Sequence, residues 1–105
     1  MEGPKAVASA VFAAMEATDL DALGQLAADD RFLEAATRFA TRFTDLRLTP
    51  RWLIAEGDLV AAWLDLEAMV NTEPIRASAM YALRVIDGRV VDYWLAQGWP
   101  PVALT

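Results

Sequence analysis

The stretch LVAAWLDLEAMVNTEPIRASAMYALRVIDGRVVDYWLAQ (residues 59–97) decides the fold, because apolar side chains alternate along most of it. A period of two is typical of β-strands, whose successive side chains point to opposite faces of a sheet. Two turn sequences, Asn71-Thr72-Glu73-Pro74 and Asp87-Gly88, divide it. Asp-Gly favours a tight hairpin, because both central positions of a type I′ turn need positive φ. The pattern predicts antiparallel strands at Leu59–Val70, Ile75–Ile86 and Arg89–Gln97.

A fourth strand is predicted upstream, at Asp45–Ala55, followed by the turn Glu56-Gly57-Asp58. Pro50 inside this segment indicates an edge strand or a β-bulge, because proline cannot donate to a ladder hydrogen bond. At the other end of the sheet, we expect Trp99-Pro100-Pro101 to end regular structure, since the two prolines fix φ and lack N–H donors.

Before Thr44 the apolar period is that of a helix. Helices are predicted over Ala6–Ala17, Leu20–Ala27 and about Arg31–Phe43, with capping by Thr18 or Asp19 and by Asp29 or Asp30. On the third helix Arg38 and Arg42 lie one turn apart, where a solvated face is expected. The order predicts an α+β fold, with three N-terminal helices packed on a four-stranded antiparallel sheet. Strands this long must twist, so the sheet should curve into a cone-like (cystatin-like) roll.

The composition narrows the class of protein. The chain has 105 residues, 56% of them hydrophobic, and a net charge of −6. That length predicts a single domain over residues 1–105, and the apolar content excludes intrinsic disorder. The acidic balance argues against a nucleic-acid partner, and no apolar run is long enough for a membrane span. Without Cys or His the chain lacks thiol nucleophiles, disulfides and zinc sites. We expect a cytoplasmic protein with no cofactor and no metal.

Alternation assigns the faces of the long strands. On Leu59–Val70 the set that contains Leu64 and Leu66 is entirely apolar, and should face the helices. Asp65 and Glu67 then point outward, which weakens their interpretation as a catalytic carboxylate pair. Tyr81 is a phenol on the inner wall of the next strand, either a hydrogen-bond donor to a ligand or a structural phenol bonded to a carbonyl.

The last strand leaves two alternatives open. If Val90, Asp92 and Trp94 face inward, Asp92 lies in apolar surroundings and becomes the best acid/base candidate. If Val91, Tyr93, Leu95 and Gln97 face inward, Tyr93 and Gln97 line the pocket and Asp92 is exposed. We expect an apolar cavity lined by Trp52, Leu64, Leu66, Tyr81 and Trp94, with Asp92 as the titratable group beside it.

The outer face of the predicted sheet carries large apolar side chains, namely Trp63, Met69, Met80 and Ile86. Such a surface predicts a homodimer through this face. Asp65, Glu67, Arg76 and Arg84 lie on the same face and could pair across the two-fold axis. The alternative is that the tail from Trp99 to Thr105 folds back over these residues within one chain.

Three segments together resemble the SnoaL-like polyketide cyclase branch of the nuclear transport factor 2-like superfamily: VFAAMEATDLDALGQLAADD (11–30), DLRLTPRWLIAEGDLVAAWL (45–64) and YALRVIDGRVVDYW (81–94). The resemblance implies a helix-lined cone with a hydrophobic small-molecule pocket and a homodimer through the outer sheet face. Members include ring cyclases, epoxide hydrolases, isomerases and non-catalytic binders. Enzymes of the family often carry an Asp shortly after the closing Trp; here residues 95–98 offer no such carboxylate.

Three functions therefore compete. The first is a cofactor-independent cyclase or isomerase acting on an apolar, oxygenated, polyketide-like metabolite. In it Asp92 would move the proton, Tyr81 would donate a hydrogen bond, and Trp52, Leu64, Leu66 and Trp94 would bind the substrate. The second is a non-catalytic ligand-binding or dimerisation module, and the third is recognition of another protein by the outer sheet. The polar groups inside the cone should distinguish them, since an enzyme needs a titratable group at an open cavity.

Overall fold

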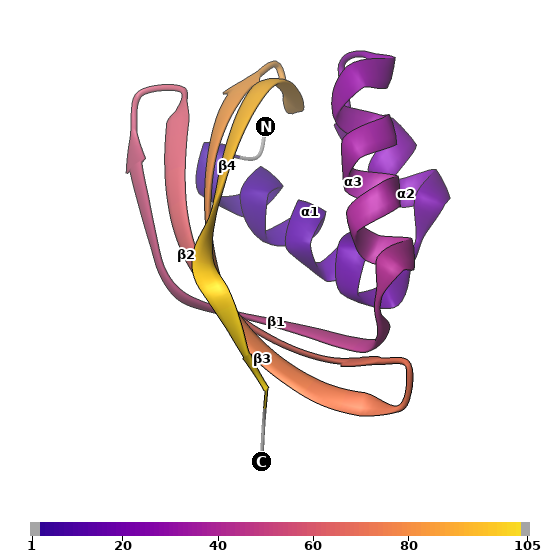
Figure 1. Cartoon of the computed structure of the whole chain (residues 1–105). Helices are drawn as coiled ribbons and strands as arrows, with labels where there is room; N and C mark the ends of the chain where they lie inside the picture. The colour runs from indigo at the N-terminus through magenta and orange to yellow at the C-terminus, as the bar shows by residue number, and fades with distance from the viewer. Residues whose placement is uncertain (1–2, 104–105) are drawn as a thin grey trace.

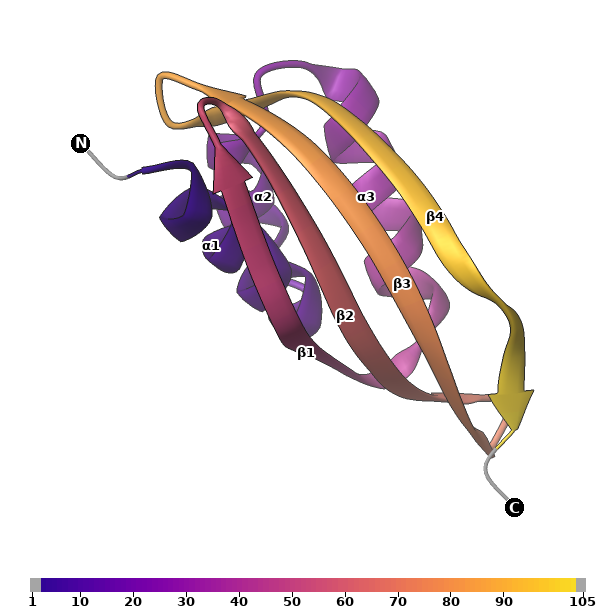
Figure 2. The ribbon, with the colours of Figure 1, turned by 90° about the vertical axis from the view of Figure 1, so that its left-hand side faces the viewer.

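The computed structural model describes residues 3–103 and has the predicted element order. The three helices and four strands are α1 (Pro4–Ala17), α2 (Leu20–Leu26), α3 (Asp30–Arg42), β1 (Thr44–Glu56), β2 (Leu59–Val70), β3 (Glu73–Ile86) and β4 (Arg89–Ala103). The strands form one antiparallel sheet in the order β1-β2-β3-β4. The sheet curves, with the helices on its concave, inner face (Figure 1). Figure 2 looks onto the opposite, outer face, with the helices behind it. The α+β prediction is confirmed.

Short polar signals set the ends of the helices. Pro4 occupies the first turn of α1, where a missing N–H costs nothing, and Thr18 ends the helix in the left-handed region. Asp19 caps α2 by accepting a hydrogen bond from the Ala22 N–H (3.1 Å). Asp29 caps α3 by accepting from the N–H groups of the next residues. Of the candidate caps, the two aspartates at positions 19 and 29 therefore make the capping bonds.

The turns between strands are tight, as predicted. Asp87 and Gly88 have φ of 53° and 77°, which is the positive pair that a type I′ hairpin needs. Asn71 and Thr72 also have positive φ, of 50° and 66°, although neither is glycine. The strands on either side are therefore joined with a fixed register, which decides the face of each side chain.

Irregularities in the ladder change those faces. In β1 the pairing passes from Pro50 to Trp52 while β2 advances by one residue, so Arg51 is an extra residue, as the proline suggested. In β4 the pairing passes from Val90 to Asp92 opposite consecutive residues of β3, so Val91 is a second extra residue. Each bulge moves the side chains that follow it to the opposite face.

The expectation that regular structure ends at Trp99-Pro100-Pro101 is wrong. β4 pairs with β3 up to Gly98, leaves the ladder over the next three positions, and pairs again at Val102 and Ala103. Both prolines therefore lie at an irregularity of an edge strand, a position where a missing N–H is tolerated. The backbone of residues 98–103 continues along β3 and does not fold back over the outer face (Figure 2). The last residues of the expected tail, 104 and 105, lie outside the described part of the chain.

The core lies between the helices and the inner face of the sheet. It is built from α1 residues such as Val11 and Met15, from Phe32 and Phe39 of α3, and from the inward set of β2 and β3. All buried residues in the described part of the chain are hydrophobic in type, and no charged side chain is among them. No helix in the described part has the length and apolar character needed to cross a membrane.

Candidate functional site

Leu64, Leu66 and Tyr81 lie together on the inner face, as predicted. Leu64 is fully buried and Tyr81 is 4% exposed. The Tyr81 ring packs against Phe12 (centroids 5.6 Å apart) and Phe39 (6.1 Å). Among the described residues, the Tyr81 hydroxyl makes no hydrogen bond. The structural alternative, in which this hydroxyl donates to a backbone carbonyl, is therefore not observed there. Burial, and then the neighbouring Tyr93, raise the pKa of Tyr81 far above its ordinary value.

Trp52 and Trp94 do not join this group, which corrects the expected facing of both. Trp52 pairs with Trp63 and Trp94 with Ala82, so both lie on the outer face, where they are 51% and 49% exposed. The cause is the same in each strand: the bulge at Arg51 precedes Trp52 and the bulge at Val91 precedes Trp94. Without those extra residues, alternation from Pro50 and Val90 would place both indoles inside.

The bulge at Val91 also decides between the two alternatives for β4. Val90 faces inward before it, and Tyr93 and Leu95, opposite Leu83 and Tyr81, face inward after it. The side chain of Gln97 lies outside the described part of the structure. The inward set of β4 is therefore a mixture of the two sets that strict alternation allowed.

Asp92 lies opposite Arg84 in the ladder of the edge strand, and its side chain reaches the start of α3. Its Oδ1 is 3.2 Å from Nη2 of Arg31 and accepts a hydrogen bond from the Tyr93 N–H at 2.9 Å. The side chain is 41% exposed. The structure thus brings Leu64, Leu66 and Tyr81 together, and places Asp92 away from them in an exposed ion pair.

A groove between α3 and β4, which we call the α3–β4 groove, has a volume of about 400 Å³. Its lining residues are Ala35, Arg38, Phe39, Thr41, Arg42, Tyr93 and Leu95. The apolar part comes from Phe39, which also touches Tyr81, and from the two β4 side chains. This groove is not among the sites predicted from the sequence, because Arg38 and Arg42 have the pattern of a solvated helix face. Their spacing beside Phe39 was the signal available.

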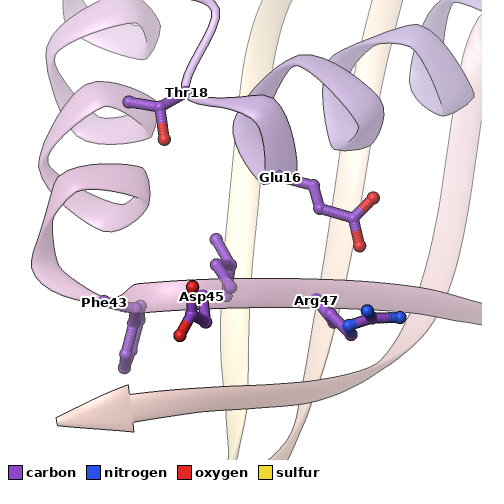
Figure 3. A pocket seen from close by; sticks show the side chains of 6 residues that line it. Glu16, Thr18, Phe43, Asp45 and Arg47 are labelled. Carbon is purple, nitrogen blue, oxygen red and sulfur yellow. The ribbon is translucent and has the colours of Figure 1, made fainter.

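A second, larger groove of about 740 Å³ lies between the end of α1 and the start of β1. Its lining residues are Glu16, Thr18, Phe43, Asp45, Leu46 and Arg47. Figure 3 shows Glu16 reaching from the end of α1 toward the strand. The Glu16 Oε1 accepts a hydrogen bond from the Leu48 N–H at 3.0 Å, which ties the helix to β1. This α1–β1 groove is polar, and one of its carboxylates already has a structural partner.

The outer face of the sheet has an apolar centre. Two adjacent rows of side chains cross the four strands, and together we call them the apolar outer patch. One row is Ile54, Ala61, Ala82 and Trp94, and the other is Trp52, Trp63, Met80 and Ala96. The Trp52 and Trp63 rings lie 5.4 Å apart. Charged residues flank the patch and are paired within the chain: Arg76 with Glu67 at 2.9 Å, Arg51 with Asp65 at 3.5 Å, and Arg84 with Asp58 at 3.1 Å.

No group of three or more Asp, Glu, His or Cys in the described residues is placed to hold a metal ion. The chemistry available on the inner side is therefore narrow. Among the described residues it consists of apolar walls, the phenols of Tyr81 and Tyr93, and two guanidinium groups at the rim of the α3–β4 groove, and the buried Tyr81 hydroxyl stays protonated at neutral pH.

Comparison with known proteins agrees with this fold. The model of the SnoaL-like domain family matches residues 30–93. IdmH from Streptomyces antibioticus has a similar structure (TM-score 0.79, 20% identity, covering 91% of this chain and 92% of that one). A SnoaL-like polyketide cyclase from Agrobacterium tumefaciens also has a similar structure (TM-score 0.80, 13% identity, covering 92% of this chain and 92% of that one). The same is true of an LEH-like epoxide hydrolase from M. tuberculosis (TM-score 0.76, 15% identity, covering 90% of this chain and 81% of that one). No match to the sequence is found among curated proteins.

Proposed function

The chain belongs to the SnoaL-like domain family, and from that premise we propose that it binds an apolar, oxygenated small molecule in the α3–β4 groove. The observation that carries the proposal is the composition of this groove. Its floor is formed by Phe39, Tyr93 and Leu95, and its volume of about 400 Å³ lies in the range of small-molecule sites. Two relatives of the same fold are a polyketide cyclase and an epoxide hydrolase, which supports an oxygenated organic ligand.

Binding is favoured over catalysis because of what the inner side lacks. A proton-transfer enzyme needs a base within reach of its substrate. In the described part of the chain no carboxylate is buried, and Asp92 is held in an exposed ion pair with Arg31 at the start of α3. The function that these observations support is a non-catalytic ligand-binding module.

Cofactor-independent cyclisation or isomerisation remains the second candidate, and Tyr81 is the observation that favours it. Its raised pKa keeps the hydroxyl protonated, so that it could donate a hydrogen bond to a carbonyl oxygen on which negative charge develops. Such a reaction would have to take its base from the substrate or from water. Turnover that depends on the Tyr81 hydroxyl, tested with Tyr81→Phe, would favour this candidate over simple binding.

The binding proposal is tested by calorimetric titration with a neutral bicyclic ketone, 2-acetonaphthone. Leu95→Ala removes part of the groove floor, and we expect its affinity to fall by roughly threefold to tenfold, from the apolar area lost. Leu20→Ala is the matched control, because Leu20 is a similarly exposed leucine on α2 that lies outside the groove. Equal affinities for wild type and Leu95→Ala, or no binding at all, would contradict the proposal.

A second copy of the chain is the partner that the apolar outer patch fits best. Trp52, Met80 and Trp94 are each 41% or more exposed and lie in adjacent rows of one face. A continuous exposed patch of this kind marks an interaction surface, and a two-fold dimer lets one patch cover itself. The flanking charges are paired within the chain, so the apolar centre would carry the affinity.

A further inference from the structure

We propose that the α3–β4 groove selects ligands that carry a carboxylate on an aromatic or polycyclic body. The inference rests on the binding function proposed above and specifies the class of its ligand. Arg38 and Arg42 lie one helical turn apart on α3 and both line the groove, with the aromatic side chains of Phe39 and Tyr93 beside them. A cationic rim next to an apolar floor matches a ligand with an anionic end and an apolar body.

The charge at this groove runs against that of the whole chain. The protein carries a net charge of −6, yet the described residues that line the groove include two arginines and no acidic residue. Four other arginines each have a carboxylate oxygen within 3.5 Å, namely Arg31, Arg51, Arg76 and Arg84. For Arg38 and Arg42, as for Arg47 and Arg89, the structure has no such partner within 4.0 Å among the described residues, and Glu34, one turn before Arg38, makes no ion pair with it. Only Arg38 and Arg42 of these four lie beside the apolar side chains of the α3–β4 groove.

Part of this arrangement has a structural explanation. Arg42 is in the last turn of α3, where a positive charge interacts favourably with the helix dipole. That effect falls off within one turn, so it does not account for Arg38. The hydroxyl of Thr41, which lies between them in the lining, donates its hydrogen bond to the Thr37 carbonyl at 2.8 Å. Its proton is therefore not available to a ligand. The two guanidinium groups are left to bind a carboxylate, for which their planar N–H donors are well suited.

Both arginines are exposed, so each contact should be modest. Ion pairs in water are weak and are screened by salt. We expect each arginine to contribute between about twofold and fivefold in affinity at low ionic strength, and the two together up to about twentyfold. The gain should shrink when the salt concentration rises from roughly 0.02 M to 0.5 M.

The test compares two probes of the same shape, 2-naphthoate and its neutral methyl ester, by calorimetric titration against the full-length protein. Wild type should bind 2-naphthoate more tightly than the ester. Arg38→Gln, Arg42→Gln and the double variant should lose this preference stepwise without weakening binding of the ester. Arg89→Gln is the control, because it removes the same charge from a β4 residue outside the groove.

Each outcome separates this inference from the function on which it rests. A preference for 2-naphthoate that disappears in the double variant and persists in Arg89→Gln supports the inference. Equal binding of acid and ester would overturn it and leave the binding function standing. A preference lost equally in Arg89→Gln would also overturn it, since the whole molecule's charge would then be the cause. Failure of both probes to bind would refute the proposed function as well.

Discussion

Tyr81 should make the protein sensitive to alkaline pH, and the sign follows from its burial. In the unfolded chain a tyrosine ionises near its ordinary value of about 10. In the folded protein, burial raises the pKa of Tyr81 well above that value, and electrostatic interaction with Tyr93 raises it further. Between those two values the folded state keeps a proton that the unfolded state has lost. Stability contributed by the neutral phenol is therefore fully present below about pH 10 and declines as the pH rises above it.

The magnitude follows from the same linkage. At pH 11, one unit above the ordinary tyrosine pKa, the free energy of unfolding should be about 1.4 kcal/mol lower than at neutral pH through this one group. Tyr81→Phe removes the titrating hydroxyl and keeps the ring that packs on Phe12 and Phe39. Urea denaturation followed by circular dichroism, at several pH values between about 8 and 11, should show a steeper loss of stability in wild type than in the variant. Parallel pH curves for the two proteins would refute the reasoning.

Three further predictions concern the core, the outer face and Asp92. Leu64→Ala should lower the free energy of unfolding by about 2–5 kcal/mol, because Leu64 is fully buried. Leu20→Ala, at an exposed position on α2, should lower it by less than about 1 kcal/mol. Urea titration measures both values, and equal losses would contradict the assigned core. Met80→Glu should convert the dimer to a monomer in light scattering, because it places a charge in the apolar outer patch. Leu20→Glu adds the same charge outside the patch and should leave the dimer intact. A monomeric wild-type protein at micromolar concentration would refute the dimer. Asp92→Asn should change stability by no more than about 1 kcal/mol and leave ligand affinity unchanged, because its ion pair with Arg31 is exposed; a loss of turnover or binding in calorimetry would return Asp92 to the site.

The order of the elements could be predicted from the sequence because each signal is local. The helical period before Thr44, the Asp19 and Asp29 caps and the Asp87-Gly88 turn need only neighbouring residues to act. The same holds for Leu64 and Leu66, which lie in a strand that pairs with β3 in unbroken register, so that alternation assigns their face correctly.

Faces beyond a bulge could not be predicted in the same way. One extra residue in a strand reverses the face of every side chain that follows, and a bulge depends on the partner strand as much as on its own sequence. Pro50 indicates a possible bulge next to Arg51, but nothing in the sequence around Val91 indicates the bulge there. Strict alternation therefore predicts Trp52, Asp92 and Trp94 beside Tyr81, whereas the structure places both tryptophans on the outer face and Asp92 in an exposed ion pair with Arg31.

The α3–β4 groove was missed for a different reason. Arg38 and Arg42 look like a solvated helix face until β4 is placed beside α3, and that contact joins segments more than 50 residues apart in the chain. Likewise the continuation of β4 beyond Pro101 depends on the free edge of β3 being available for pairing. Both features are properties of the tertiary arrangement, which local patterns do not record.

The most direct test of small-molecule binding in the α3–β4 groove is to map amide chemical-shift changes when 2-naphthoate is added to the isotopically labelled protein. The account predicts that the largest changes fall on residues 35–42 of α3 and on Tyr93 and Leu95 of β4. Changes confined to Glu16, Asp45 and Arg47 of the α1–β1 groove, or no changes at saturating probe, would contradict it.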